Sequence, residues 1–284
     1  MRVLVLGVSG MLGNAVFRYI SEAKGHEVFG SARSASARRA FAPELAAKIV
    51  LGTDVDNQDS LALLFAQVKP QVVINCIGLI KQLASANDPL QAIPINSLLP
   101  HRLARLCEIA GARLVHVSTD CVFSGSKGNY VESDASDAKD LYGRSKYLGE
   151  VDYPHAITLR TSIIGHELAS ANGLVGWFLA QQGTINGFTK AIFSGFPTIE
   201  LAHIIGDVVL PQPALRGLYH VASEPISKYA LLKLVASVYG KQIEITPQDE
   251  FVLDRSLNAE RFRLAAGYAP PPWPELVKKM FDFK

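Results

Sequence analysis

Short, continuous apolar runs alternate with segments of helical periodicity through the first half of the chain. Runs of this kind are typical of strands buried on both faces of a parallel sheet, and they occur at residues 3–6, 26–30, 48–51, 72–75, 113–118 and 156–160. Helical patterns lie between them, most clearly at 11–23, 60–68 and 100–110. Alternation at this spacing predicts an α/β fold with a doubly wound parallel sheet, joined by right-handed crossovers.

Beyond about residue 165, the alternation of strand-like and helical segments is less regular. A glycine-bearing stretch at 183–195 precedes a helical run at 228–239, a short strand at 243–246 and a proline-rich segment at 270–274. We therefore expect a main domain over residues 1–164 and a smaller C-terminal lobe, mainly for substrate binding, over 165–284. Parts of 196–225 can return to the main domain.

The turn between the first strand and the first helix holds three glycines, Gly7, Gly10 and Gly13. Glycines here permit a tight turn, let the backbone approach a pyrophosphate and allow close helix–strand packing, and the helix N-terminus attracts phosphate. The spacing differs from the commoner G-x-G-x-x-G, and an ordinary strand–helix turn is the alternative. The pattern predicts a dinucleotide-binding (Rossmann) domain whose phosphate loop comprises Gly7, Ser9, Gly10, Met11, Leu12 and Gly13.

The end of the second strand carries Ser31 and Arg33, where a carboxylate would mark a free ribose 2′-hydroxyl. A serine hydroxyl and a guanidinium would instead receive a 2′-phosphate. NADP(H) is therefore favoured, NAD(H) stays open, and a solvated 33–39 loop is the alternative. The other residues expected to line the cofactor are Asp54, Val55, Cys76, Ile77, Gly78, Ser118, Tyr142 and Lys146.

Tyr142 and Lys146 are four residues apart in a helical segment, so both side chains lie on one face. The ammonium can stabilise a phenolate, lower the pKa of the tyrosine and let it exchange a proton near neutral pH. Ser118, Thr119 and Asp120 end the preceding strand, where a hydroxyl could hold a carbonyl oxygen beside the phenol. The spacing alone also arises by chance in helices.

Composition narrows the function classes. Hydrophobic residues make up 49% and charged residues 19%, and the net charge of +2 argues against a nucleic-acid polymer as partner. The three cysteines have no metal spacing, no His, Cys or carboxylate cluster indicates a metal site, and a reducing, cytoplasmic setting is expected. No secretory signal and no apolar run of about 20 residues is evident, so we expect no membrane partner.

The glycine loop, residues 75–78, residues 118–120 and the pair of Tyr142 and Lys146 follow one another along the chain. In this order, these motifs resemble those of the extended short-chain dehydrogenase/reductases. Residues 118–125, Tyr130 with Glu132, and 142–150 resemble the dTDP-4-dehydrorhamnose reductase family more narrowly, as do 159–161, Leu253 with Asp254, and Trp273. Residues 184–188 and 194–200 are more similar to reductases of UDP-linked 4-keto-6-deoxy sugars. The nucleotide, the sugar and the product stereochemistry therefore stay open.

The resemblance implies NADPH-dependent reduction of a sugar C4 carbonyl in surface polysaccharide biosynthesis. It assigns Tyr142 as the general acid and Lys146 as the residue that adjusts the pKa of Tyr142 and holds the nicotinamide ribose. Thr119 would form a hydrogen bond with the substrate carbonyl or with the tyrosine hydroxyl. Asp120, Arg160 and Thr161 are substrate-binding candidates, although Asp120 could cap a turn and Arg160 could be salt-bridged. Asn96 matches a polar position of the family or caps a helix.

Two other readings remain open. An epimerase or dehydratase would need a tightly held NAD, and the missing acid near Arg33 argues against it. A regulatory NADP-binding subunit would have no reason to keep Thr119, Tyr142 and Lys146 in register. His203 and His220 lie in apolar stretches and are expected to be structural. Oligomeric state is undetermined, with a homodimer as one option.

Overall fold

The computed structural model describes residues 1–22, 25–80, 84–168 and 171–283, and a seven-stranded parallel sheet forms its centre. The strand order is β11-β6-β5-β4-β1-β2-β3, and every neighbouring pair is parallel. The strands are β1 (Arg2–Leu6), β2 (Glu27–Ala32), β3 (Ile49–Leu51), β4 (Val72–Asn75), β5 (Arg113–Thr119), β6 (Ala156–Thr161) and β11 (Gly217–His220). The predicted doubly wound fold is confirmed, and β11 is an added edge strand that the sequence did not indicate.

Burial explains why the central strands read as continuous apolar runs. Residues 3–6 of β1 are fully buried, with Val3 and Val5 in one core and Leu4 and Leu6 in the other. The sheet therefore needs a layer on each face. The chain leaves β1 for β2 on one side and reaches β4 on the other, so the order reverses beside β1. A reversal of this kind opens a crevice at the carboxyl ends of the strands.

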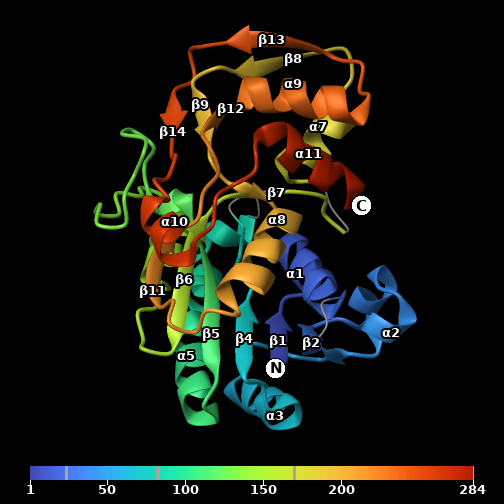
Figure 1. Cartoon of the computed structure of the whole chain (residues 1–284), viewed down its shortest axis with the longest axis vertical. Helices are drawn as coiled ribbons and strands as arrows, with labels where there is room; N and C mark the ends of the chain where they lie inside the picture. The colour runs from blue at the N-terminus through green and yellow to red at the C-terminus, as the bar shows by residue number, and fades with distance from the viewer. Residues whose placement is uncertain (23–24, 81–83, 169–170, 284) are drawn as a thin grey trace.

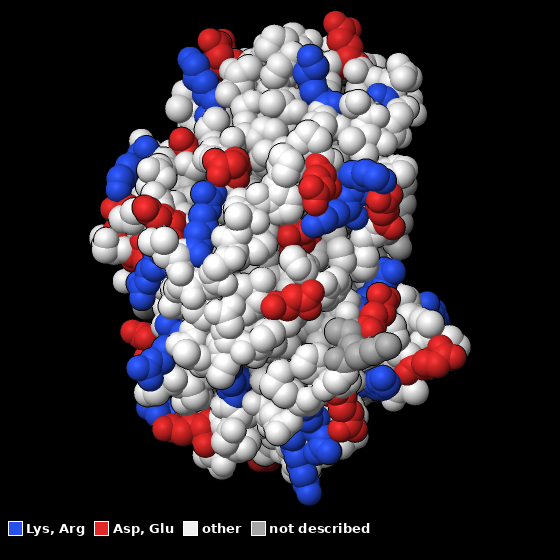
Figure 2. Space-filling model, in the orientation of Figure 1, with Lys and Arg blue, Asp and Glu red and all other residues white. Residues whose placement is uncertain are grey.

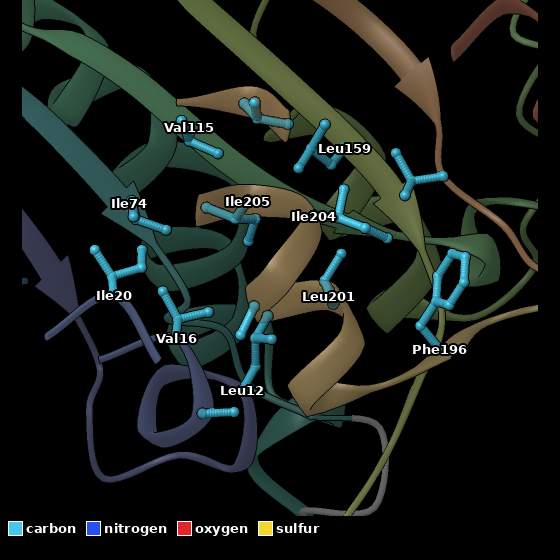
Figure 3. Close-up of a cluster of buried hydrophobic side chains, with 14 of the residues drawn as sticks. Leu12, Val16, Ile20, Ile74, Val115, Leu159, Phe196, Leu201, Ile204 and Ile205 are labelled. Carbon is cyan, nitrogen blue, oxygen red and sulfur yellow. The ribbon is translucent and has the colours of Figure 1, made fainter. Parts of the chain in front are cut away.

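Helices cover both faces of the sheet. Figure 3 shows α1 (Met11–Glu22) and the segment of α8 (Thr198–His203) and η5 (Ile204–Val209) packed over β4, β5 and β6. The opposite face is covered by α3 (Gln58–Val68) and α5 (Leu99–Ala110). The other helices are α2 (Pro43–Ala46), α4 (Pro89–Ala92), α6 (Leu141–Leu148), α7 (Leu174–Ala180), α9 (Lys228–Tyr239), α10 (Glu260–Ala266) and α11 (Trp273–Asp282). Short helical turns are η1 (Ala35–Ala40), η2 (Ala84–Asn87), η3 (Ile93–Leu98) and η4 (Asp120–Val122).

Three small sheets build the C-terminal lobe, which lies beyond the carboxyl ends of the central strands (Figure 1). In one, β9 (Ala191–Phe193) runs between β12 (Ile226–Ser227) and β14 (Leu253–Asp254). The others pair β8 (Thr184–Phe188) with β13 (Glu244–Gln248), and β7 (Ile163–Ile164) with β10 (Phe196–Pro197). The lobe therefore combines strands that are up to about sixty positions apart in sequence, as the pairing of Thr184 with Glu244 shows.

The segment between 196 and 225 lies largely against the central sheet. Within it, α8 packs on α1, and β11 pairs with β6 in the large sheet. The boundary at residue 164 stays a prediction. Figure 2 shows basic and acidic side chains interspersed on the face it draws. In the described part of the chain, no helix combines the length and apolarity needed to cross a membrane.

Candidate active site at the carboxyl ends of the strands

The glycine loop has the close packing that its sequence predicts. Gly7 has a positive φ of 84°, which glycine adopts without strain, and its carbonyl oxygen accepts a hydrogen bond from Gly10 N at 3.0 Å. A Cβ added at Gly13 would overlap the Gly7 carbonyl oxygen. Ser9 and Gly10 are exposed, Met11 is partly buried and Leu12 packs into the core (Figure 3). The backbone at the start of α1 is thus open to a phosphate group.

The end of β2 presents a serine and a free arginine. Ser31 is buried within the strand, whereas Arg33 is exposed and makes no hydrogen bond or ion pair with the described residues. Arg38 donates a hydrogen bond to the Ile49 carbonyl at 2.7 Å, which connects η1 to β3. Among these side chains, Arg33 is the one available to a 2′-phosphate.

Asp54 and Val55 follow β3. The Asp54 carboxylate accepts from the backbone N–H of Asp56 at 3.1 Å, and its own N–H donates to the Ser60 hydroxyl at 3.0 Å. Asp54 is exposed and Val55 is partly buried against the core beneath α3. This turn stands beyond β3, on the same edge of the sheet as the glycine loop.

Asn96 holds the loop after β4 in place. Its side-chain oxygen accepts from Leu79 N at 2.9 Å, and its side-chain nitrogen donates to the Ser145 hydroxyl at 3.1 Å. A Cβ added at Gly78 would lie 3.4 Å from Asn96 Oδ1 and 3.8 Å from Lys146 Nζ. Asn96 therefore ties the Gly78 loop to α6, and its side chain does not cap a helix.

Two further residues of that loop, Cys76 and Ile77, are partly buried. Asn75 at the end of β4 accepts from Ile77 N at 3.1 Å and bonds to the His116 ring at 3.1 Å. These contacts fix the backbone at the strand-order reversal, where Gly7 also lies: a Cβ added at Gly7 would be 2.8 Å from Ile77 Cγ1. The loops that follow β1 and β4 thus lie in direct contact, and the two together are called the cradle.

Thr119, Tyr142 and Lys146 converge at the end of β5. Lys146 is buried, and its ammonium donates to the Val117 carbonyl at 2.9 Å. Thr119 is near enough to the Tyr142 phenol to act on its pKa, and its hydroxyl donates to Asp120 at 3.2 Å. A hydroxyl, a phenol and an ammonium thus occupy one side of the cradle.

Burial decides the ionisation of these groups. It raises the pKa of Tyr142, with the nearby acidic groups adding to the effect, so the phenol keeps its proton at neutral pH. The prediction that Lys146 lowers the pKa of Tyr142 is wrong: burial raises this pKa, and the group that acts in the lowering direction is Thr119. Burial also lowers the pKa of Lys146 to about 8, despite the opposing charge of Glu150.

Asp120 lies beside these groups in η4. Burial raises the pKa of its carboxyl, and the Arg255 guanidinium and hydrogen bonds from Cys121 and Thr119 partly oppose that effect. Thr119 Oγ1 caps the same turn by accepting from Cys121 N at 3.1 Å. It is therefore Thr119, and not Asp120, whose side chain caps the start of the turn.

Arg160 is engaged within the protein. Its guanidinium donates to both oxygens of Glu150, at 2.7 and 2.6 Å, and the two side chains are 2% and 10% exposed. Glu150 Oε1 also accepts from the Ser118 hydroxyl at 2.7 Å, and Arg160 contacts His220 Nε2 at 3.1 Å. A substrate-binding role for Arg160 stays a prediction, as does that of the buried Thr161, which donates to the Ser162 carbonyl at 3.2 Å.

Three residues of this region were missed as candidates by sequence reasoning. Glu150 lies four residues after Lys146, so helical spacing could have linked them. Lys228 and Arg255 belong to the C-terminal lobe; Arg255 acts to lower the pKa of Asp120, and Asp120 acts to raise the pKa of Lys228. Arg255 directly follows Leu253 and Asp254, which the resemblance had already marked, but no local pattern indicated that it reaches β5.

The two histidines expected to be structural have protein partners. His220 contacts the Tyr130 carbonyl at 2.9 Å, and burial lowers its pKa to about 4. His203 lies 3.1 Å from Glu200. Across the described ranges, no three His, Cys, Asp or Glu side chains are grouped so that they could hold a metal ion.

This chain is similar to known proteins over most of its length. A family model described as the RmlD substrate binding domain matches residues 1–283. The probable low-salt glycan biosynthesis reductase Agl14 of Haloferax volcanii is 28% identical over 278 residues, which are 94% of this chain and 87% of that protein. Methionine adenosyltransferase 2 subunit beta of Danio rerio is 26% identical over 252 residues, covering 84% of this chain and 74% of its own.

A solved structure of similar fold is the dTDP-4-dehydrorhamnose reductase of Bacillus anthracis in complex with NADP. It is 21% identical, has a TM-score of 0.80, and the match covers 100% of this chain and 99% of that one. Because the family model spans nearly the whole chain, the protein belongs to the RmlD substrate-binding-domain family of the extended short-chain dehydrogenase/reductases.

Proposed function

We propose that this protein reduces the C4 keto group of a nucleotide-linked 4-keto-6-deoxyhexose with NADPH. The observation that carries the proposal is the convergence of Thr119, Tyr142 and Lys146 beside a glycine cradle fit for a dinucleotide. The cradle has no room for a Cβ at Gly13, which leaves backbone N–H groups facing the phosphates. The relative Agl14, named as a glycan biosynthesis reductase, supports the same chemistry.

Each residue has a defined task in this reaction. The reduced nicotinamide supplies the hydride to the carbonyl carbon. Tyr142 gives its phenolic proton to the carbonyl oxygen as that oxygen becomes a hydroxyl, and its raised pKa keeps the proton available. Thr119 orients the phenol, and the Lys146 ammonium, held by the Val117 carbonyl, places a positive charge beside the developing oxyanion.

The substrate panel tests the proposal directly. Purified protein and NADPH are mixed with dTDP- and UDP-linked 4-keto-6-deoxyhexoses, and absorbance of the reduced nicotinamide is followed. The proposal predicts oxidation of NADPH with at least one of these sugars, in equal amount to the hydroxy sugar formed. Absence of oxidation with the whole panel rejects the reductase function.

A second function is that of a non-catalytic subunit, because one relative is named as a subunit of methionine adenosyltransferase. The aligned Thr119, Tyr142 and Lys146 favour the enzyme, since a subunit needs no proton donor. An epimerase or dehydratase is less well supported, because Arg33 occupies the place of the acid that would mark NAD. In the panel, an epimerase or dehydratase that recycles its NAD would cause no net oxidation of NADPH.

Arg33 should determine the preference for NADPH over NADH. Replacement by alanine removes the charged group offered to the 2′-phosphate, so we expect the KM for NADPH to rise by about ten- to a hundredfold. The KM for NADH should change little, because NADH has no 2′-phosphate. The exposed Arg105, paired with Glu108 on α5, provides the matched control through Arg105→Ala. Equal changes with the two cofactors would contradict the assignment of Arg33.

The rate should fall at alkaline pH as Lys146 loses its proton. Its pKa of about 8 lies below the ordinary value, so we expect kcat/KM to decline above about pH 8. The unfolded state binds more protons than the native state between this pKa and the ordinary one, so the contribution of Lys146 to stability rises with pH over the same window. Loss of activity is therefore not explained by unfolding through this group.

A pH series of kcat/KM, with circular dichroism at each pH, measures this effect. Lys146→Arg keeps its charge over the whole range, so the alkaline decline should disappear even if the overall rate is lower. A decline that persists unchanged in Lys146→Arg would assign the titration to another group.

A further inference from the structure

A histidine is buried within the central sheet, next to the end of β4. His116 lies on β5, where it is the direct cross-strand partner of Asn75 on β4 and of Thr158 on β6. All three residues are completely buried. A polar group without access to water needs a hydrogen-bonding partner inside the protein, so the partners of each member of this row show what it does.

The hydrogen bonds of Asn75 determine which nitrogen of His116 carries the proton. Asn75 Oδ1 accepts from Ile77 N at 3.1 Å, so the amide oxygen faces the loop after β4. The amide nitrogen Nδ2 then lies 3.1 Å from His116 Nδ1, and an amide nitrogen can only donate. His116 Nδ1 is therefore the acceptor, and the neutral ring carries its proton on Nε2.

The surroundings of the ring keep it neutral. Burial lowers the pKa of His116 well below its ordinary value, and the charge of Lys146 acts in the same direction. An imidazolium would carry a proton on Nδ1, directed at the amide protons of Asn75, and the hydrogen bond between them would be lost. Because Nε2 has no partner among the described residues, the bond to Asn75 is the polar contact through which this ring acts.

The loop held by Asn75 is one side of the cradle. Ile77 N is bonded to the Asn75 amide, and a Cβ added at Gly7 would be 2.8 Å from Ile77 Cγ1. A half-turn of the amide would bring its NH₂ group against the Ile77 N–H, where neither can accept a hydrogen bond. The orientation of this one amide therefore decides whether the loop stays fixed against the glycine turn.

We propose that His116 is a positioning residue for the dinucleotide: its neutral ring, protonated on Nε2, keeps the Asn75 amide in the orientation that holds the Ile77 backbone in the cradle. His116 acts through Asn75 and not on the reacting atoms. This rests on the proposed function in taking the cradle as the site of the nicotinamide dinucleotide. We expect the effect on cofactor affinity and not on the chemical step, which is assigned to Thr119, Tyr142 and Lys146.

NMR of ¹⁵N-histidine-labelled protein measures the state of the ring directly. At neutral pH, the His116 nitrogens should have the shifts of a neutral ring with its proton on Nε2, and the signal absent from His116→Phe identifies them. Asn75→Asp keeps an oxygen for Ile77 N and presents a second oxygen to the ring, so Nδ1 should become protonated. A wild-type ring that is charged, or neutral with its proton on Nδ1, overturns the proposal.

Cofactor binding measures the positioning. His116→Phe keeps a ring but lacks the acceptor, so the Asn75 amide can turn and release Ile77 N. We expect the Kd for NADPH, from fluorescence titration, to rise by about tenfold and the Ile77 amide to exchange its hydrogen faster. The value of kcat at saturating NADPH should stay close to that of the wild type. His116→Asn, whose side-chain oxygen can take the place of Nδ1, should restore most of the affinity.

Thr158→Val is the matched control. Thr158 is the neighbour of His116 on β6, but its hydroxyl donates to the Val151 carbonyl at 2.8 Å and accepts from Val151 N at 3.1 Å. The change should lower the melting temperature while NADPH affinity and Ile77 exchange stay as in the wild type. Equal losses of affinity in Thr158→Val and His116→Phe would indicate a general loosening of the sheet and overturn the positioning role.

The outcomes distinguish this proposal from the reductase function, because none of the binding or NMR measurements needs a keto sugar. Wild-type NADPH affinity in His116→Phe overturns the positioning role even if the protein reduces keto sugars. Weaker NADPH binding in His116→Phe with recovery in His116→Asn upholds it even if no keto sugar oxidises NADPH. If His116→Phe does not fold, the wild-type tautomer and the affinity of His116→Asn decide in the same way.

Discussion

Tyr142→Phe is expected to lower kcat by about a hundred- to ten-thousandfold, the usual contribution of a positioned general acid. Phenylalanine keeps the ring but lacks the proton that the new alkoxide needs. The affinity for NADPH should stay unchanged, because the phenol oxygen contacts Thr119 rather than the glycine loop. Single-turnover oxidation of NADPH with the active keto sugar, and fluorescence titration of NADPH, measure the two quantities.

Tyr147→Phe is the matched control for this change. Tyr147 is on the same helix but is 45% exposed, so its hydroxyl should contribute neither to the rate nor to stability. A Tyr142→Phe variant with wild-type kcat would remove this tyrosine from proton transfer. A variant that lost NADPH affinity in parallel would instead indicate a structural role.

Glu150→Gln is expected to lower the free energy of unfolding by about 3–5 kcal/mol, because it leaves a buried charge without its partner. The Glu150 carboxylate accepts hydrogen bonds from Nε and Nη2 of Arg160 and from the Ser118 hydroxyl. His220 cannot replace the lost negative charge, because an imidazole is never an anion and the neutral ring offers Arg160 only a hydrogen bond. Urea unfolding at neutral pH measures the change.

The exposed pair of Arg105 and Glu108 provides the comparison. Their side chains are 62% and 55% exposed, so Glu108→Gln should change stability by about 1 kcal/mol or less. Replacing both members of the buried pair, Glu150→Gln with Arg160→Met, should be milder than Glu150→Gln alone, since no charge is then stranded. Equal stability of wild type and Glu150→Gln would show that Arg160 finds other partners.

Glu150 also affects the ionisation of Lys146 in the candidate site. The Glu150 charge raises the pKa of Lys146 against the effect of burial. In a Glu150→Gln protein that stays folded, the alkaline decline of kcat/KM should therefore begin at a lower pH than in the wild type. A purely structural role for Glu150 would leave the position of this decline unchanged.

Periodicity located the central elements well. The predicted strand at 72–75 and helix at 228–239 coincide with β4 and α9, and the other central strands differ by a few residues at their ends. These elements depend on local patterns, such as an apolar run between turn signals or an alternation with helical period. β11 was missed because its four residues, Gly217–His220, do not form a continuous apolar run, and they join the sheet only by pairing with β6.

The candidate site likewise combines features that local sequence patterns predict with contacts that they do not predict. Gly7, Gly10 and Gly13 lie at a strand–helix turn, and Tyr142 and Lys146 share a helix, so neighbouring positions alone placed them correctly relative to one another. Arg160 lies near the end of a strand, and the sequence predicted that it binds substrate or forms a salt bridge. Its ion pair with Glu150 depends on how α6 meets β6, and no local spacing encodes that contact.

Local patterns along the chain are sufficient to predict the parallel sheet, the phosphate loop and the helix that carries the proton donor, because each arises from the order of residues within one short segment. Packing between distant segments decided the ionisation of Tyr142 and Lys146, since burial outweighs the effect of their immediate neighbours. It also decided that Arg255 reaches the turn after β5, where it donates to the Phe123 carbonyl. The position of Arg255 results from the pairing of β14 with β9, a long-range contact that the chain makes only when the lobe folds.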